Sequence, residues 1–184
     1  MNFGSDNVAG VAPEIMAAIT EANTGVAVPY GGDAISTRLD EVFSSLFETR
    51  TQVFPVATGT AANALGLAML CPPYGSVYCH PAAHIATDEA GAPEFYTSGA
   101  KLLLVDGALA KIAAADLDAV LATDVERFPH SVKRAAVSIS QATERGAVYT
   151  ANEVAGLSEI AHRHGMGLHM DGVRFANSIA HLGC

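Results

Sequence analysis

The chain has 184 residues, of which 50% are hydrophobic and 16% are charged, and its net charge is −9. This composition suits a buried sheet covered by helices and excludes a disordered chain. An acidic balance with only ten scattered Lys and Arg residues excludes the basic surface that nucleic-acid binding needs.

Cysteine usage and apolar runs indicate the compartment. Cys71, Cys79 and Cys184 form neither a metal-binding spacing nor an even disulfide set, which fits a reducing environment. The sequence shows no signal-peptide pattern and no run of about 18 apolar residues that would span a membrane. We therefore expect a cytoplasmic protein that does not bind membranes.

Apolar runs alternate with helical patterns along the chain. We expect helices at 13–23, 35–47, 60–70, 114–122, 151–164 and 174–182, and strands at 52–57, 76–79, 101–105, 135–140 and 167–170. Continuous apolar runs such as 102–105 are typical of strands buried on both faces, as in parallel sheets. The alternation predicts a three-layer α/β domain with a mostly parallel sheet, in which ligands collect at the carboxyl ends of the strands.

A run of small polar residues, 58–63, follows the first predicted strand and opens a helix. Thr58, Gly59 and Thr60 place hydroxyl groups and free helix amides at one point, where the helix dipole favours an anion such as a phosphate monoester. The alternative is an ordinary N-capped helix without a ligand.

Two histidines, His80 and His84, follow the second predicted strand, with Asp88 and Glu89 shortly after them. A metal site is one interpretation. Pro81 between the histidines makes a helical ligand pair unfavourable, so we expect no metal. A loop imidazole at a strand end can instead stack on a flat ring or move protons.

The last two predicted strands also end in polar residues. Gln141 follows the strand 135–140 and either caps a turn or bonds a ring substituent. Asp171 and Arg174 follow the strand 167–170, where they form either a salt bridge or a pair that binds a ring nitrogen and a carboxylate. His169 is interpreted as a packed strand residue.

Taken together, these strand-end residues describe one ligand, pyridoxal phosphate with an amino acid bound. Their order along the chain, together with two turn-like segments near the N-terminus, resembles the low-specificity L-threonine aldolases, in the β-eliminating lyase group of fold-type I pyridoxal-phosphate enzymes. The matching segments are 5–7, 30–31, 58–63, 83–91, 138–144 and 169–177.

The resemblance implies a role for each matching residue. Thr58, Gly59 and Thr60 would hold the cofactor phosphate, and Asp171 would pair with the ring nitrogen. His84 would stack on the ring and assist proton transfer. The remaining implied contacts are Gln141 near the ring, Ser5 and Arg174 at the substrate carboxylate, and Tyr30 at the site of a neighbouring subunit.

The implied reaction cleaves L-threonine, L-allo-threonine or a related β-hydroxy-α-amino acid to glycine and an aldehyde. The implied assembly is a homodimer or a dimer of dimers, that is, a homotetramer. Gly4, Gly32 and Val173 depart from residues that are usual in the family. A different fold-type I lyase, related to tyrosine phenol-lyase or to desulfurases, is less favoured by the segments around Gln141 and Asp171.

The family lysine that holds the cofactor covalently lies well after the segment that contains Arg174. Lys101, Lys111 and Lys133 all precede that segment, so we expect none of them to fill this role. We expect an N-terminal arm and helix at 1–30, a partial cofactor-binding large domain at 31–184, and no small C-terminal domain. The alternative to an aldolase is a catalytically inactive, lysine-less fragment that only binds the cofactor or a partner chain.

Overall fold

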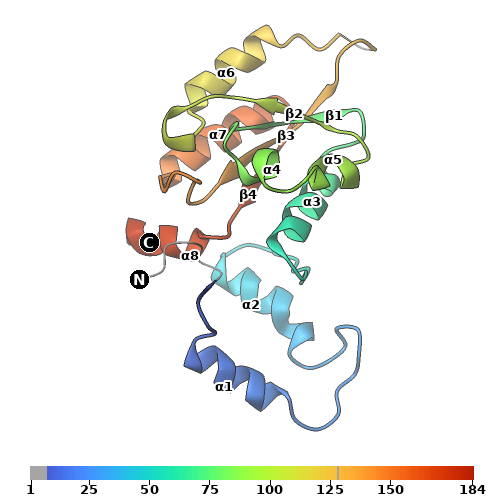
Figure 1. Ribbon diagram of the computed structural model, residues 1–184, viewed down its shortest axis with the longest axis vertical. Helices are drawn as coiled ribbons and strands as arrows, with labels where there is room; N and C mark the ends of the chain where they lie inside the picture. Colours follow the sequence, from blue (N-terminus) through green and yellow to red (C-terminus); the bar gives the residue numbers. More distant parts are fainter. Residues whose placement is uncertain (1–7, 128) are drawn as a thin grey trace. The chain divides into compact units, whose positions relative to one another are not determined.

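The computed structural model describes residues 8–127 and 129–184. The chain divides into two compact units, Met1–Pro55 and Val56–Cys184. This division falls later than the boundary predicted after residue 30. Figure 1 labels the helices and strands of both units.

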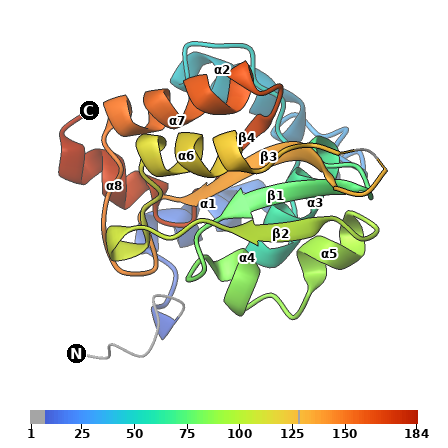
Figure 2. The same ribbon diagram turned by 90° about the horizontal axis from the view of Figure 1, so that it is seen from above.

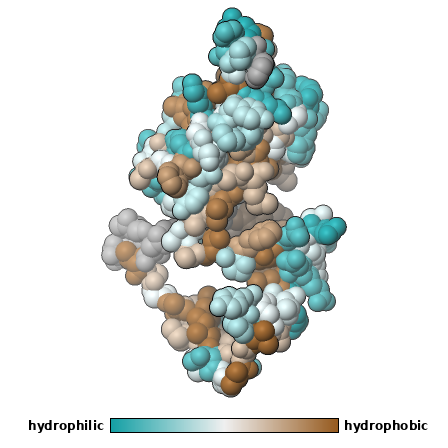
Figure 3. Space-filling model, turned by 90° about the vertical axis from the view of Figure 1, so that its right-hand side faces the viewer, coloured by the Kyte–Doolittle hydropathy of each residue, from teal (hydrophilic) through white to brown (hydrophobic). Residues whose placement is uncertain are grey.

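The first unit is helical, with α1 (Pro13–Ala22), the short 3-10 helix η2 (Ser36–Arg38) and α2 (Leu39–Leu46). Pro13 starts α1 as predicted, because a proline at the first helical position loses no hydrogen bond. None of the described residues 8–55 is fully buried. Apolar side chains such as Ile15, Met16 and Ile19 of α1 are about half exposed, and Figure 3 shows apolar surface over this part of the chain.

The second unit is built on four parallel strands in the order β2-β1-β3-β4. They are β1 (Gly75–Cys79), β2 (Lys101–Leu104), β3 (Lys133–Ser140) and β4 (Gly167–Asp171). The chain passes from β1 to β2 on one side and places β3 on the other side of β1. This reversal is a topological switch point, and in open parallel sheets it creates a crevice at the carboxyl ends of the strands.

Helices cover both faces of the sheet, which confirms the predicted three-layer α/β fold (Figure 2). One face carries a core cluster that includes Leu117 and Leu121 of α6 (Ala114–Thr123) and Leu157 of α7 (Ala151–Arg163). The other face carries a second cluster around Leu67 of α3 (Gly59–Leu70) and Ile85 of α4 (His84–Thr87). The remaining elements are α5 (Ala92–Tyr96), the 3-10 helix η3 (Ala108–Ala110) and α8 (Phe175–Leu182).

The strand predicted at 52–57 is wrong. This segment is irregular and enters none of the strand pairs of the described residues. The N–H of Val53 instead donates to Asp40 Oδ1 at 2.8 Å, and Phe54 is 66% exposed. An apolar run becomes a strand only where a neighbouring strand supplies hydrogen-bond partners, and none of the described strands does so here.

Among the described residues, none of the helices combines the length and the apolar character that crossing a membrane requires.

Candidate active site

The N-terminus of α3 is capped by Thr58, which fits both the predicted anion site and the alternative of an ordinary capped helix. Thr58 is the N-cap, and its Oγ1 accepts a hydrogen bond from the N–H of Ala61 at 3.1 Å. A Cβ added to Gly59 would meet no atom within 4 Å, so the space beside this backbone is open. Because the first amides of a helix have no intrahelical acceptor, the N–H groups at Gly59 and Thr60 suit an anion that enters this space.

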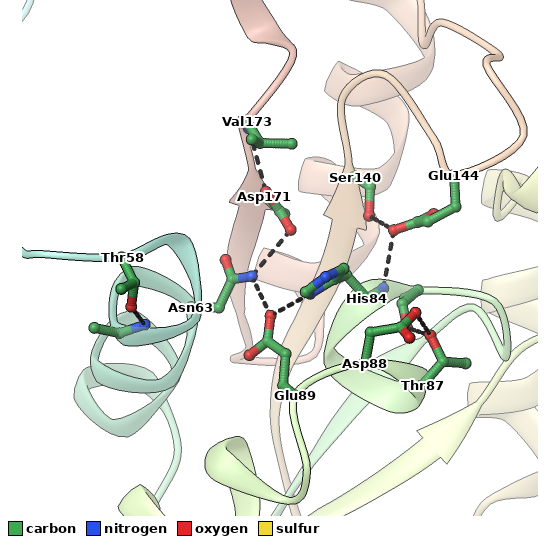
Figure 4. Close-up of polar contacts among 12 residues, drawn as sticks. Thr58, Asn63, His84, Thr87, Asp88, Glu89, Ser140, Glu144, Asp171 and Val173 are labelled. Atoms are coloured by element: carbon green, nitrogen blue, oxygen red, sulfur yellow. Dashed lines mark hydrogen bonds and ion pairs between the residues drawn. The ribbon is translucent and has the colours of Figure 1, made fainter. Parts of the chain in front are cut away.

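Asp171 lies at the end of β4, and both of its carboxylate oxygens are held. Oδ2 accepts a hydrogen bond from Asn63 Nδ2 of α3 at 2.9 Å, and Oδ1 accepts one from the N–H of Val173 at 3.2 Å. Asn63 lies about one helical turn after Gly59, roughly 6 Å along the α3 axis. The predicted anion site and the predicted partner of a ring nitrogen therefore belong to one edge of the sheet (Figure 4).

His84 opens α4, shortly after β1 ends, and its ring is tied to a buried acid. His84 Nδ1 lies 2.8 Å from Glu89 Oε1, and the same oxygen accepts a hydrogen bond from Asn63 Nδ2 at 2.7 Å. The side chain of Glu89 has no exposed surface, whereas that of His84 is 46% exposed. One edge of the imidazole is thus fixed inside the protein while the rest of the ring stays accessible.

A second acid fixes the backbone of the same loop. Glu144 Oε1 accepts hydrogen bonds from the N–H of His84 at 2.9 Å and from Ser140 Oγ at 2.6 Å. Ser140 is the last residue of β3. The carboxyl ends of β1 and β3, which flank the switch point, are therefore joined through one carboxylate.

The pKa values of His84 and His169 are shifted in opposite directions. The hydrogen bond to Glu89 raises the pKa of His84 above its ordinary value, with smaller contributions from the charges of Asp171 and Asp88. His169 lies on the α3 side of β4, where its ring faces Gly66, and Ser138 Oγ lies 2.9 Å from its Nδ1. Burial lowers the pKa of His169. His169 is therefore a packed strand residue, as the sequence predicts.

The metal interpretation of His80 and His84 has no support in the geometry. His80 Nδ1 accepts a hydrogen bond from the N–H of Ala82 at 3.0 Å, and its Nε2 lies 3.1 Å from the Gly107 carbonyl oxygen. The described part of the chain holds no group of three or more His, Cys, Asp and Glu side chains arranged for a metal ion.

The side-chain amide of Gln141 bonds the backbone of Tyr149, whereas the sequence predicts a contact with the cofactor ring. Its Oε1 accepts a hydrogen bond from the N–H of Tyr149 at 2.9 Å, and its Nε2 donates to the Tyr149 carbonyl at 2.8 Å. Its backbone N–H donates to the carbonyl oxygen of Asp171 at 2.9 Å. The buried side chain thus holds the loop after β3, and the ring contact stays a prediction.

The remaining predicted residues are Ser5, Tyr30 and Arg174. Ser5 falls outside the described residues. Tyr30 belongs to the first unit, where it occupies a turn with a positive φ of 60° and is fully exposed. Arg174 is the N-cap of α8, directly after the Asp171 loop. For these three residues the predicted substrate or subunit contacts stay predictions.

Sequence reasoning assigned no role to Asn63, Glu89 or Glu144, which hold the cluster together. All three stand inside the segments singled out at the strand ends. Asn63 could have been found from its position in the sequence. It lies four residues after Gly59, and residues i and i+4 of a helix lie on the same face, so its side chain is on the same face of α3 as the anion site.

Comparisons with known proteins identify the family and the relatives of this chain. The β-eliminating lyase family model matches residues 2–184. Over 183 residues, the chain is 45% identical to a low-specificity L-threonine aldolase of Pseudomonas aeruginosa, and the match covers 99% of this chain and 52% of that protein. It is 43% identical over 182 residues to a low-specificity L-threonine aldolase of a Pseudomonas species, with 99% and 52% covered. The chain thus spans about half the length of the curated relatives it matches.

The structure agrees with these relatives. A solved threonine aldolase from Leishmania major superposes with a TM-score of 0.85 at 28% identity, and the match covers 94% of this chain and 49% of that one. Because the family model matches residues 2–184, this chain belongs to the β-eliminating lyase family.

Proposed function

We propose that this chain supplies the cofactor-binding part of a pyridoxal-phosphate-dependent aldolase, which cleaves L-threonine or L-allo-threonine to glycine and acetaldehyde. The hydrogen bond that joins Asn63 of α3 to Asp171 of β4 carries the proposal, because it brings an anion-favouring helix start and a carboxylate to one place. The threonine aldolases among the relatives support the choice of reaction.

The residues present fit the cofactor. The amides at Gly59 and Thr60, with Thr58 as the cap, would hold the phosphate. Asp171, whose oxygens are already oriented by Asn63 and Val173, would keep the pyridine nitrogen protonated. When bound, pyridoxal phosphate supplies an electron sink for the electron pair that is left on the substrate α-carbon.

His84 would act on the substrate hydroxyl. Its Nδ1 faces Glu89, which leaves Nε2 for the substrate, and its side chain is 46% exposed. Nε2 would accept the proton of the β-hydroxyl group as the bond between Cα and Cβ breaks, so that the oxygen becomes the carbonyl oxygen of the leaving aldehyde. Arg174 and Ser5 would bind the substrate carboxylate, and Gln141 would contribute a ring contact only if its amide left Tyr149.

None of the lysines in the chain suits the covalent attachment of the cofactor. Lys101 and Lys133 begin β2 and β3, at the edge of the sheet opposite the cluster. Lys111 Nζ donates to Glu153 Oε1 at 2.5 Å and to the Val148 carbonyl oxygen at 3.1 Å. We therefore propose that the attachment lysine is not among these 184 residues.

We also propose that the protein is a homo-oligomer, a dimer or a dimer of dimers, of the cytoplasm. The support for assembly is the half-exposed apolar surface of α1 and the lack of fully buried residues in 8–55. Tyr30, fully exposed in its turn, would then reach the site of a neighbouring subunit. The support for the compartment is the set of free cysteines, Cys71, Cys79 and Cys184.

The test combines binding with chemistry. Pyridoxal phosphate is titrated into the 184-residue chain, and the complex is treated with borohydride and analysed by peptide mass mapping. We expect saturable binding without a modified lysine. The product of the complete reading frame should release glycine from L-threonine. Binding that persists after Asp171→Ala and Gly59→Ala, or a modified Lys101, Lys111 or Lys133, would contradict the proposal.

A further inference from the structure

Glu89 is an acid that the sheet and its helices enclose completely, yet it contacts two residues of the candidate site. Its Oε1 lies 2.8 Å from His84 Nδ1 and 2.7 Å from Asn63 Nδ2, whereas its buried Oε2 contacts no hydrogen-bond partner among the described residues. A buried carboxylate is costly unless partners compensate for the lost water. The burial of Glu89 in spite of this cost indicates a role beyond packing.

The hydrogen-bond directions follow from the donors that are present. An ionised carboxylate oxygen only accepts, so with Glu89 ionised the proton between His84 and Glu89 belongs to Nδ1. The amide nitrogen of Asn63 has two hydrogens, and one points at Glu89 while the other points at Asp171. The resulting chain runs from the imidazole to the carboxylate proposed for the ring nitrogen without a break (Figure 4).

We propose that Glu89 is a positioning residue that holds neutral His84 in the tautomer with its proton on Nδ1, and that Asn63 fixes Glu89 in place and links it to Asp171. Nε2 is then the nitrogen with the free electron pair. The identity of the group that Nε2 acts on rests on the proposed function, whereas the tautomer does not.

The proton balance is simple. The β-hydroxyl proton moves to Nε2, which makes His84 a cation with protons on both nitrogens. The Nδ1 proton stays in its hydrogen bond, where the negative charge of Glu89 stabilises the new cation. After the aldehyde leaves, Nε2 returns its proton to water, and the original tautomer is restored. The α-carbon, which keeps the electron pair of the broken bond, takes one proton from water to become glycine, so the overall reaction neither consumes nor releases a proton.

Other charges around His84 do not fix its ring. Asp171 and Asp88 act on it only through space. Asp88 accepts a hydrogen bond from Thr87 Oγ1 at 2.8 Å. Glu144 contacts the backbone N–H of His84 and not the imidazole. Among these acids only Glu89 contacts a ring nitrogen of His84, so the tautomer depends on it.

The experiment measures the ring nitrogens directly. Protein labelled with 15N at histidine is studied by long-range 1H–15N correlation as a function of pH, without cofactor, and His84 is assigned with His84→Gln. We expect neutral His84 to carry its proton on Nδ1, the tautomer that is less populated in a free histidine side chain. A neutral His84 with its proton on Nε2 would overturn the proposal, and this result needs no variant to fold.

Two matched variants separate the hydrogen bond from the general charge. Glu89→Gln removes the charge that contacts the ring, and Asp88→Asn removes a neighbouring charge that does not. We expect Glu89→Gln to lower the pKa of His84 and to move the neutral ring toward the Nε2–H tautomer, and Asp88→Asn to keep the Nδ1–H tautomer. Equal behaviour of the two variants would contradict the assignment of Glu89.

Activity supplies a second readout in the complete protein. A base must be unprotonated, so the rate falls as the pH drops through the pKa of His84. We expect Glu89→Gln to shift this acidic limb to lower pH, and Asp88→Asn to shift it less. If the protein lacks aldolase activity, the proposed function fails, while the tautomer measurement still decides the role of Glu89.

Discussion

The side-chain amide of Asn63 lies 2.9 Å from Asp171 Oδ2, which joins the first part of α3 to the end of β4 across 108 positions of sequence. This contact places the two ends of the proposed cofactor site at one edge of the sheet. It also orients Asp171 before any ligand arrives, and such preorganisation lowers the cost of binding.

Asp171→Asn tests the partner of the ring nitrogen. The change keeps the shape of the side chain but removes the charge that would favour a protonated ring. A hydrogen bond to a charged group contributes roughly 1.5–3 kcal/mol, so we expect the dissociation constant for pyridoxal phosphate to rise about 10- to 100-fold. Equilibrium titration followed by absorbance measures it. An unchanged dissociation constant would remove Asp171 from the site.

Gly59→Ala tests the anion site without disturbing the fold. A Cβ at this position meets no protein atom within 4 Å, so it would occupy only the space proposed for the phosphate. Alanine is also the better helix former by up to about 1 kcal/mol. We therefore expect an unchanged or higher melting temperature together with at least a tenfold loss of cofactor affinity.

The matched control for Gly59→Ala is Gly156→Ala in α7, where the new Cβ would lie 3.6 Å from that of Ala114, an ordinary contact. This variant should gain similar stability and bind the cofactor like the parent. If both variants bind equally well, close approach to Gly59 is not required.

Much of the second unit follows from the sequence. β1, β2, β3 and β4 form where apolar runs predict them. β1 is buried along its whole length, as a parallel strand covered on both faces should be. The same expectation for the run 102–105 is wrong, because β2 lies at the edge of the described sheet and its Leu104 is 57% exposed. The helices α4 and α5, with four and five residues, were not predicted because they are too short to show a helical period. The failed strand at 52–57 shows the limit of the same argument, because pairing depends on a neighbour that local sequence does not reveal.

Only some residues of the candidate site can be predicted from the sequence. Residues that follow strands or open helices, such as Gly59 and Asp171, can be found from position alone. The contact of Glu89 with Asn63 depends on how α3 packs against the segment between α4 and α5, which no local pattern encodes. The Gln141 amide shows the opposite case, because its polar group satisfies the backbone of Tyr149 and not a ligand.

Acid should weaken the fold through Glu153 in the capping box at the start of α7. A hydrogen bond from Lys111, followed by one from the Thr150 N–H, lowers the pKa of Glu153 from 4.5 to about 2. Because the folded-state pKa is depressed, this stabilisation is present above about pH 4.5 and is lost as the pH falls toward 2.

The test compares the free energies of unfolding of Glu153→Gln and the parent between about pH 3 and pH 7, a range that covers the titration of a carboxylate. We expect the variant to be less stable at neutral pH and to lose less stability on acidification. Glu159→Gln is the control, since the side chain of Glu159 is 77% exposed and lies 3.4 Å from Arg163 in an exposed ion pair. Parallel pH curves for Glu153→Gln and the parent would count against this role.

Leu157 tests the core on the α6 and α7 side of the sheet. The residue is fully buried at 0% exposure within the larger core cluster. Leu157→Ala should lower the free energy of unfolding by about 2–5 kcal/mol, because it removes buried methyl groups and leaves a cavity. Asn152→Ala, at an exposed position of the same helix, should change it by less than about 0.5 kcal/mol in chemical denaturation. Similar losses for both variants would place Leu157 outside the core.

The most direct test is a crystal structure of the protein grown with pyridoxal phosphate. The phosphate should accept hydrogen bonds from the backbone amides at Gly59 and Thr60, with the ring nitrogen within hydrogen-bond distance of Asp171 and the ring beside His84. A phosphate bound away from the start of α3, or a ring nitrogen that faces any group other than Asp171, would contradict the account.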